Sequence, residues 1–396
     1  MDKKSLKFFV WFLSIILILL TFCGCIEDGQ KLVYIEELFD TQTTLNQPSI
    51  LPDWEDGVYH EYYKTTDLLN EFQINYPYLV NVFSIGESVL GKEIWCIRIT
   101  NEKNIKSKFS CIIDGCIHGC EWEAGEACLY LAEYLLINYG KNTTVNQILN
   151  NSEVYIIPLL NPDGRQKDDR FNENGIDLNR NFDIDFGRIR GHSIPLGKLF
   201  GRIKIPYFRF DRLHKWFPKF PLFLTNSGRR PFSEPETRAL RDFMIDVDDK
   251  DFSFYVNCHT AVHSFGSPWT AFKPPFQMST IEKNILDFVI NWVAQNTEYE
   301  NAESGSQAVS YKASGTAPDW CFKEFRVPCF TFEILSQDYE PGAGGGKHDS
   351  LVHWMKTTLP VFLYLLVNIE NLNLWKTPDL QSALPDGVPP ESPRSG

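Results

Sequence analysis

Apolar runs alternate with segments of helical periodicity from about residue 58 to residue 372. Strands are predicted at 79–85, 93–99, 252–258 and 327–334, and the nearly continuous apolar runs at 109–114 and 154–160 are typical of buried strands. Apolar residues spaced three and four apart predict helices at about 66–76, 121–139, 233–246, 279–295 and 350–368. Strands that alternate with helices predict a single α/β domain, with a mixed, mostly parallel central β-sheet covered by helices on both faces.

Two of the predicted helices begin with a recognisable start signal. The stretches 233–236 (Ser-Glu-Pro-Glu) and 279–282 (Ser-Thr-Ile-Glu) each place a Glu three residues after a Ser, which is typical of a capping box. No linker-like composition interrupts the predicted domain at 58–372. The acidic residues 26–57 before it are interpreted as a stalk, and the Pro-rich residues 373–396 as a flexible tail.

Residues 1–25 have the layout of a secretory signal. Three Lys precede an apolar run at 8–22, and Cys-Gly-Cys follows. A small residue before a Cys is similar to a lipoprotein processing site, which makes Cys25 the candidate lipid-bearing residue. The alternative is an uncleaved anchor helix, since residues 8–25 approach the roughly 17 to 25 residues that span a bilayer. Both alternatives predict an extracytoplasmic protein that is tethered to the cell membrane.

Composition narrows the classes of function. Hydrophobic residues make up 43% of the 396-residue chain and charged residues 22%, which excludes a wholly disordered protein. A net charge of −13 and a pI of about 5.2 argue against nucleic acid as the main partner. Eight cysteines follow Cys25, mostly in apolar contexts, and they are interpreted as buried thiols without any indicated disulfide pairing.

Candidate chemistry gathers where predicted strands end. The sequence contains no Gly-x-Ser-x-Gly elbow, no phosphate-binding loop and no His-Glu-x-x-His helix. Instead, His118 and Glu121 follow the strand 109–114, His259 follows the strand 252–258, and Glu333 ends a later strand. Ligand sites of helix-covered sheets lie beyond the carboxyl ends of the strands. Two His and a Glu form a known catalytic zinc set, and a further carboxylate suits a general base.

From about residue 59 to residue 369, the chain resembles the zinc carboxypeptidases of the carboxypeptidase A type. Six motifs follow the order of that family: His118–Trp122, Asn161–Gly164, Asn174–Phe182, Cys258-His259 with Pro268, Tyr311–Gly315 with Asp319-Trp320, and Phe330–Glu333. The resemblance implies a zinc carboxypeptidase-like fold over 58–372 with one Zn²⁺ per chain. It also implies a metallocarboxypeptidase that hydrolyses the C-terminal peptide bond of peptides or proteins with metal-activated water.

The resemblance implies a role for each residue of the metal centre. His118, Glu121 and His259 would be the zinc ligands. Glu333 would be the general base, which takes a proton from the attacking water and passes it to the leaving amine. Arg170 would polarise the scissile carbonyl and stabilise the oxyanion that forms from it.

The same resemblance implies the residues that bind the substrate. Arg180 would hold the terminal carboxylate in a bidentate pair, and Asn179 would add a hydrogen bond. Tyr311 would close over the terminal residue, and Asp177 would orient a ligating imidazole. Cys120 departs from the pattern, because better-known relatives carry there an Arg that contacts the substrate further from the cut.

The positions near the expected specificity pocket carry no charge, and they favour a neutral or apolar C-terminal residue in the substrate. These positions are Thr316, Ala317, Pro318 and Thr331.

The segment 188–230 is an unusual insertion. It contains eleven Lys or Arg and one acid, so it carries about +10 within a chain of net charge −13. Aromatic residues are interleaved with the basic ones, a pattern that favours contact with anionic headgroups or an acidic polymer. The alternative is a loop that folds over the acidic surface of its own domain.

Two other functions stay open at this point. A zinc amidohydrolase of the same fold could act on cell-wall peptides or conjugates, although Arg180 and Asn179 favour a free carboxylate. A non-catalytic binding module on a peptidase fold would be expected to lack a zinc ligand or the base. His118, Glu121, His259 and Glu333 are all present.

Overall fold

The computed structural model describes residues 59–187, 226–260, 264–271, 274–302, 306, 312–334 and 348–373. Several predictions fall outside these ranges. They concern the signal or anchor segment with Cys25, the stalk at 26–57, residues 188–225 of the insertion, Tyr311 and the tail from residue 374. These stay predictions.

Within the described residues, eight strands form one mixed sheet in the order β1-β2-β4-β3-β5-β8-β6-β7. The four central strands run parallel to one another, and β1 and β2 pair antiparallel at one side. On the other side β6 pairs antiparallel with β8 and parallel with β7. The strands are β1 (Val80–Glu87), β2 (Glu93–Ile99), β3 (Phe109–Asp114), β4 (Ser152–Ile157), β5 (Phe252–His259), β6 (Ser264–Gly266), β7 (Glu300–Ala302) and β8 (Cys329–Glu333).

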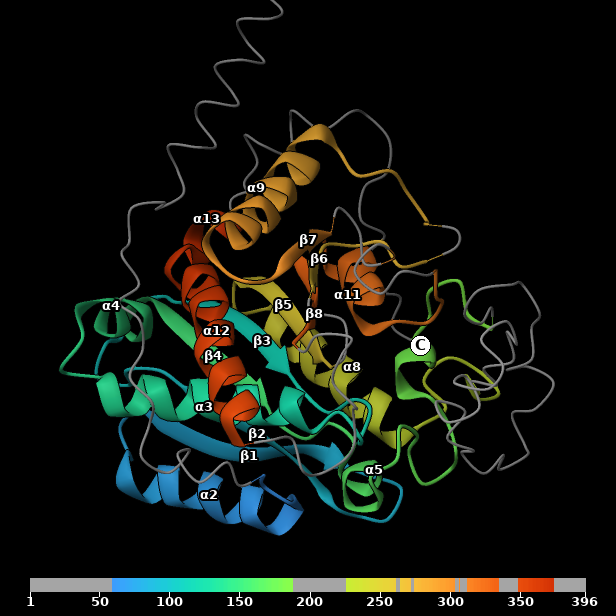
Figure 1. The fold of residues 1–396 in the computed structure, drawn as a ribbon, viewed down its shortest axis with the longest axis horizontal. Coiled ribbons are helices and arrows are strands. Elements are labelled where there is room, and N and C mark those ends of the chain that lie inside the picture. Colours follow the sequence, from blue (N-terminus) through green and yellow to red (C-terminus); the bar gives the residue numbers. More distant parts are fainter. Residues whose placement is uncertain are drawn as a thin grey trace, which may run out of the picture. The chain divides into compact units, whose positions relative to one another are not determined.

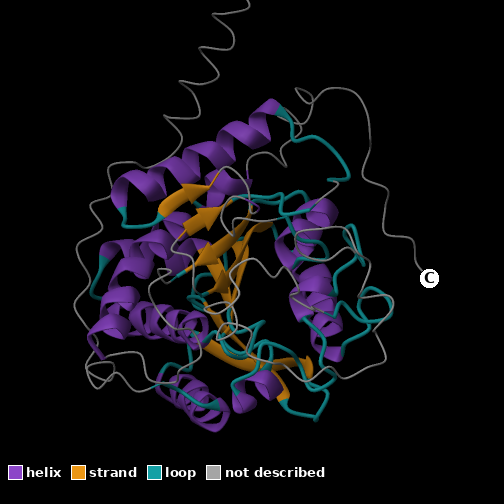
Figure 2. Cartoon of the chain, turned by 45° about the vertical axis from the view of Figure 1, so that its right-hand side comes forward, coloured by secondary structure: helices purple, strands orange, loops and turns teal. Residues whose placement is uncertain are grey.

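Helices lie on both sides of this sheet (Figure 2). In Figure 1, α2 lies along β1, and α12 crosses α3, which packs on the central strands. Among the others, α8 packs on β1, α11 on β5 and β8, and α13 on β3 and β5. The helices are α2 (Tyr62–Asn75), α3 (Trp122–Asn138), α4 (Thr143–Asn151), α5 (Pro162–Lys167), the 3₁₀ turn η2 (Leu178–Arg180), α8 (Pro235–Asp248), α9 (Thr280–Asn296), α11 (Ala317–Phe325), α12 (His348–Val367) and α13 (Ile369–Asn373).

The central strands are buried because helices cover both of their faces. Every residue of β5 is buried, and so is every residue of β3 after Phe109. This arrangement explains why the two strands read as continuous apolar runs rather than alternating ones. The predicted fold class, a helix-covered and mostly parallel mixed sheet, is confirmed.

The structure confirms one of the two predicted capping boxes and contradicts the other. Ser279 accepts from the N–H of Glu282, whose carboxylate accepts in return from the N–H of Ser279, so this capping box is confirmed. The prediction for Ser233 is wrong. Glu234 occupies the N-cap of α8 without a side-chain cap, and the Ser233 hydroxyl donates to the Glu234 carboxylate at 2.7 Å.

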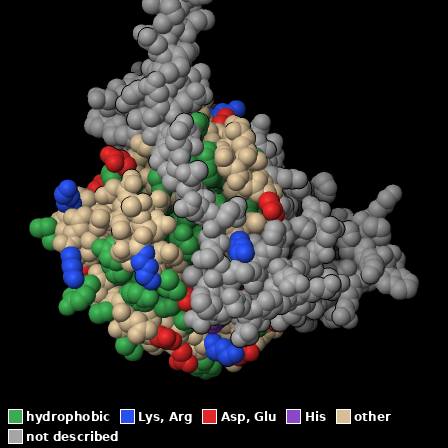
Figure 3. Space-filling view, turned by 60° about the vertical axis from the view of Figure 1, so that its left-hand side comes forward, with side chains coloured by type: hydrophobic (Ala, Val, Ile, Leu, Met, Phe, Trp, Pro, Cys, Tyr) green, Lys and Arg blue, Asp and Glu red, His purple; other side chains and the backbone are tan. Residues whose placement is uncertain are grey.

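On the face drawn in Figure 3, the visible Lys and Arg side chains are interspersed with Asp and Glu. No helix of the described residues is long and apolar enough to cross a membrane. All eight cysteines of the described residues are free thiols, as interpreted from the sequence.

Candidate active site

His118, Glu121 and His259 meet at the carboxyl end of the central strands. The Nδ1 atom of His118 lies 2.7 Å from Oε1 of Glu121, and Nδ1 of His259 lies 2.8 Å from Oε2 of the same carboxylate. One ligand atom from each of the three residues can be chosen so that all lie within 4.8 Å of one another. All three side chains are buried. This donor set fits a catalytic Zn²⁺ with an open coordination position.

Three separate local structures bring these ligands together. His259 is the last residue of β5, and His118 lies in the turn between β3 and α3. Glu121 occupies the N-cap of α3 but does not cap that helix, so its carboxylate is directed to the two imidazoles. The turn approaches α5 so closely that a Cβ on Gly119 would lie 2.0 Å from the carbonyl carbon of Gly164. Only glycine fits there.

The charges within the triad suit metal binding. Burial would raise the pKa of Glu121, but the positive charges that His118 and His259 can carry outweigh it and hold this pKa well below its usual value. Burial lowers the pKa of His259, which the Glu121 carboxylate opposes in part. An ionised carboxylate and a neutral imidazole are the protonation states that a metal requires.

Asp177 connects the metal centre to Arg170. One oxygen of Asp177 lies 3.1 Å from Nε2 of His118, and the other accepts from Nε of Arg170 at 3.0 Å. Arg170 also donates to Glu121 at 3.5 Å. Burial would raise the pKa of Asp177, but the charges of Arg170, Arg180 and His118 hold it well below its usual value. Asp177 therefore contacts the ring nitrogen of His118 that does not face Glu121, a position from which a carboxylate can orient the imidazole.

A side-chain amide, rather than a carboxylate, contacts Nε2 of His259. Its Nε2 lies 2.5 Å from Oδ1 of Asn257, and the Asn257 amide N–H donates to Asp114 at 2.5 Å. Tyr255 donates its hydroxyl to the other oxygen of Asp114 at 2.6 Å. Burial raises the pKa of Asp114 to about 7, although these two hydrogen bonds oppose the shift. Sequence reasoning missed Asn257 and Asp114.

Glu333 lies beside the triad. It ends β8, is buried, and is the register partner of His259 on β5. Adjacent residues of paired strands present their side chains on the same face of a sheet. Glu333 is therefore held at the metal centre by main-chain pairing.

Asn179 and Arg180 lie on η2, next to the triad. The Asn179 amide lies 3.0 Å from Nε2 of His259, and its oxygen accepts from the N–H of Ala317 at 2.8 Å. Arg180 is buried and donates to the carbonyl of Asn179 at 2.6 Å. A Cβ on Gly315 would lie 2.3 Å from the carbonyl oxygen of Arg180. The residue just before the N-cap of α11 therefore packs directly on η2.

Comparison with known proteins identifies this arrangement. A family model described as zinc carboxypeptidase matches residues 65–342, well over half of the chain. The chain belongs to the zinc carboxypeptidase family. Carboxypeptidase A6 of Mus musculus is 25% identical over 334 residues, which are 78% of this chain and 67% of that protein. Carboxypeptidase D of Rattus norvegicus is 37% identical over 115 residues, which are 28% of this chain and only 8% of that relative's length.

Solved structures show the same fold. Thrombin activatable fibrinolysis inhibitor aligns with a TM-score of 0.63 at 21% identity, covering 86% of this chain and 80% of that one. Carboxypeptidase A from Helicoverpa armigera aligns with a TM-score of 0.62 at 19% identity, covering 88% and 81%. In this member of the zinc carboxypeptidase family zinc is the cofactor, and His118, Glu121 and His259 form a group that could hold it.

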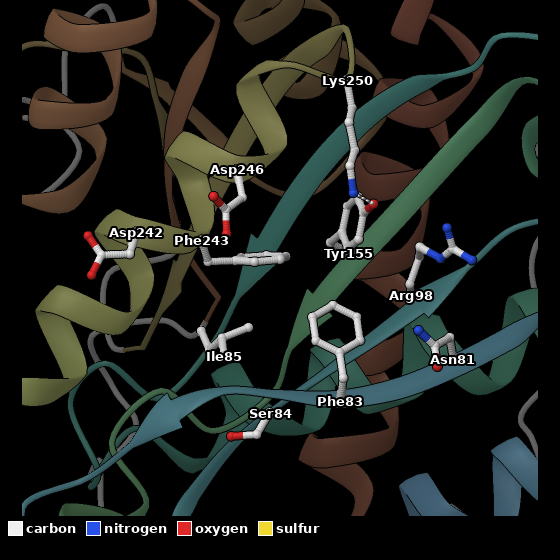
Figure 4. Close-up of a pocket in the computed structure, with 10 residues that line it drawn as sticks. All are labelled: Asn81, Phe83, Ser84, Ile85, Arg98, Tyr155, Asp242, Phe243, Asp246 and Lys250. Atoms are coloured by element: carbon white, nitrogen blue, oxygen red, sulfur yellow. Dashed lines mark hydrogen bonds between the residues drawn. The ribbon is translucent and has the colours of Figure 1, made fainter. Parts of the chain in front are cut away.

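A pocket of about 450 Å³ lies between strands β1, β2 and β4 and helix α8 (Figure 4). Phe83, Tyr155 and Phe243 pack against one another there, with Lys250 donating to the Tyr155 hydroxyl at 3.3 Å. The pocket contains none of the predicted site residues.

Proposed function

We propose that this chain is a zinc-dependent metallocarboxypeptidase that removes C-terminal residues from peptides or proteins. The observation that carries the proposal is the convergence of a buried His-Glu-His triad with Glu333, the register partner of His259, and with Arg170, which donates to Glu121. Membership of the zinc carboxypeptidase family supports a hydrolase that acts on peptide bonds.

Each residue around the triad is given a separate role in hydrolysis. Bound zinc supplies Lewis acidity, which polarises a carbonyl and acidifies water. Glu333 takes the proton of the attacking water and delivers it to the leaving amine. Arg170, anchored on Asp177, donates to the oxygen on which negative charge develops. Asp177 and Asn257 keep the two ligating imidazoles in position.

Arg180 is the proposed anchor for the substrate's terminal carboxylate. A guanidinium matches two carboxylate oxygens with parallel N–H bonds, which an ammonium does not. Arg180 directly follows Asn179, whose amide contacts His259, so a carboxylate held there lies near the metal. Tyr311, which lies outside the described residues, is proposed to close over the bound terminal residue.

We propose a preference for a neutral or apolar C-terminal residue. Asp319 could have recognised a basic side chain, but its carboxylate accepts from the N–H groups of Thr270 and Ala271 at 2.7 to 3.0 Å. Burial raises the pKa of Asp319 to about 6, which these hydrogen bonds oppose. The neighbouring buried positions carry no charge, and they are Thr316, Ala317, Pro318 and Thr331.

The test compares peptides that differ only at their C-terminus. The full chain, purified in detergent and loaded with zinc, is incubated with free-carboxylate peptides and with the same peptides amidated. Mass spectrometry follows their shortening, and Glu333→Gln is the control. Stepwise loss of single residues from the free-carboxylate set alone supports the proposal. Cleavage of amidated or cell-wall peptides instead would favour the amidohydrolase, and no cleavage by the zinc-loaded enzyme would favour the binding module.

We propose further that the enzyme works outside the cytoplasm, tethered to the membrane. Support comes from the N-terminal sequence alone, where three Lys, an apolar run and Cys25 stand in the order of a lipoprotein signal. The test is fractionation of cells that produce the wild-type chain or Cys25→Ser. A lipid anchor predicts a loss of lipid mass and release from the membrane on substitution. Membrane association that survives the substitution would indicate an anchor helix.

A further inference from the structure

A chain of three buried polar residues runs away from the metal centre through the middle of the sheet. Asp114, at the end of β3, and Asn257, on β5, are register partners, and His259 follows two residues later on β5. Alternate residues of a strand face the same side, so all three side chains lie on one face. Asp114 and Asn257 are fully buried, whereas His259 is 3% exposed. Polar groups without access to water persist when they are hydrogen-bonded to each other.

The hydrogen bonds among these buried polar residues fix the direction of the Asn257 amide. Both oxygens of Asp114 are acceptors, one for Tyr255 and one for Asn257. The amide nitrogen of Asn257 therefore faces Asp114, and its oxygen faces Nε2 of His259 at 2.5 Å. The same oxygen lies 3.3 Å from the amide nitrogen of Asn179, which donates to it. An amide turned round would present its oxygen to the acceptor oxygen of Asp114 and its N–H group to the N–H of Asn179.

We propose that Asn257, oriented by Asp114, is a positioning residue that holds His259 in the tautomer competent for zinc. A carbonyl oxygen at 2.5 Å requires that Nε2 carry the proton, and this leaves the lone pair on Nδ1, which faces Glu121. The inference rests on the metal site of the proposed function and deepens it. It concerns binding of the metal, so it stands apart from which bond the enzyme cleaves.

The two imidazole ligands are supported differently. His118 meets a carboxylate directly, since Nε2 lies 3.1 Å from Asp177. His259 meets a neutral amide, and the carboxylate of Asp114 lies one residue further back. A direct carboxylate both orients a ligand and raises its basicity, whereas a neutral amide mainly orients it. Loss of Asn257 is therefore expected to act on the tautomer and direction of His259.

The experiment measures zinc affinity in variants of the full chain by competition with a chromophoric chelator. Asn257→Leu keeps the volume but removes the acceptor, and it is expected to weaken zinc binding by roughly 10- to 100-fold. Asn257→Asp restores an acceptor for His259 beside Asp114, and it is expected to bind zinc within about threefold of the wild type. Asn368→Leu, at another buried Asn remote in sequence from the site, is the matched control.

A second measurement reads the tautomer itself. In the metal-free protein labelled with ¹⁵N-histidine, the His259 ring nitrogens should report a proton on Nε2 in the wild type and in Asn257→Asp. In Asn257→Leu the signal should become a mixture of tautomers. If the Leu variant does not fold, Asn257→Ala replaces it in both measurements.

Two results would overturn the inference. One is zinc binding by the Leu or Ala variant within threefold of the wild type. The other is a loss in Asn257→Asp as large as in the apolar variants, since that marks a purely structural role. Neither measurement uses a peptide. A wild-type protein that binds zinc but cleaves nothing would therefore remove the proposed function and leave this inference intact.

Discussion

His259 and Glu333 are register partners on the parallel strands β5 and β8, and the N–H of Ile334 donates to the carbonyl of His259 at 2.9 Å. A zinc ligand and the candidate base are therefore fixed to each other by the hydrogen-bond ladder of the sheet. Paired strands lie about 4.8 Å apart, so the two side chains leave the same face at that spacing. Substitution of the Glu333 side chain should leave the ligand in place.

Glu333→Gln is expected to lower kcat by about 10²- to 10⁴-fold, because the amide cannot accept the proton of the attacking water. Zinc content should stay at one per chain, since Glu333 is not among the three ligands. Steady-state kinetics and metal analysis on the same preparation check both statements. A variant that retains more than a tenth of the wild-type kcat would remove Glu333 from the role of base.

Arg170→Lys is expected to lower kcat by about 10²- to 10³-fold. Lys keeps the charge, but a point charge cannot contact Asp177 and the developing oxyanion together, as a guanidinium can. Arg241→Lys is the control, because Arg241 lies on α8 and pairs with Asp242 on the surface. Equal kcat values for the two variants would contradict the role given to Arg170.

Zinc removal should lower thermal stability as well as activity. A ligand that binds only the folded state stabilises it by about 4 kcal/mol at a thousandfold excess over Kd. We expect chelation to lower Tm and added zinc to restore it, whereas Mg²⁺ should not, since it disfavours nitrogen ligands. In Glu121→Gln the zinc-dependent rise in Tm should vanish. Persistence of that rise in the variant would place the metal elsewhere.

Gly315→Ala tests the contact between the loop before α11 and Arg180. Gly315 has φ +70°, and a Cβ there would meet the Arg180 carbonyl oxygen at 2.3 Å. The expected results are a destabilisation of about 1 to 3 kcal/mol and a rise in KM for free-carboxylate peptides. Gly140→Ala is the matched control, because Gly140 has φ +79° but nothing within 4 Å. It shares the backbone strain and should leave KM unchanged.

Ionisation of Glu236 is expected to lower the free energy of unfolding as the pH rises from about 4.5 to 7. Burial raises the pKa of this carboxyl to about 7, against hydrogen bonds that include those from Asn172 and Val89. Because the pKa of Glu236 is higher in the folded state than in the unfolded state, its contribution to stability is fully present at low pH and is lost as the carboxyl ionises. The loss is on the order of 2 to 3 kcal/mol. Urea unfolding at pH 5 and pH 8 measures it.

The matched variant for this pH effect is Glu236→Gln. It has no charge to bury, so the fall in stability between pH 5 and pH 8 should be smaller than in the wild type by about the same amount. An equal fall in the free energy of unfolding in the two proteins would show that ionisation of Glu236 does not destabilise the fold.

Much of the fold was predictable because it depends on local pattern. The six predicted strands are present. Burial on both faces gives β3, β4, β5 and β8 a nearly continuous apolar signature that is visible in the sequence. Short elements escaped prediction. The strands β6 and β7 have three residues each and α5 has six, too few to display a period. At Ser233 the local motif was misleading, because the hydroxyl donates to the Glu234 carboxylate instead of capping the helix.

The sequence by itself determined which residues could bind a metal, because His118, Glu121 and His259 follow buried strands and stand in motifs of a known family. Only the tertiary structure decided what holds them. Asn257 and Asp114 are 143 positions apart and meet because β3 and β5 pair in one register. A hydrogen bond needs atoms within about 3 Å. That proximity comes from strand pairing across the chain, which no local pattern encodes.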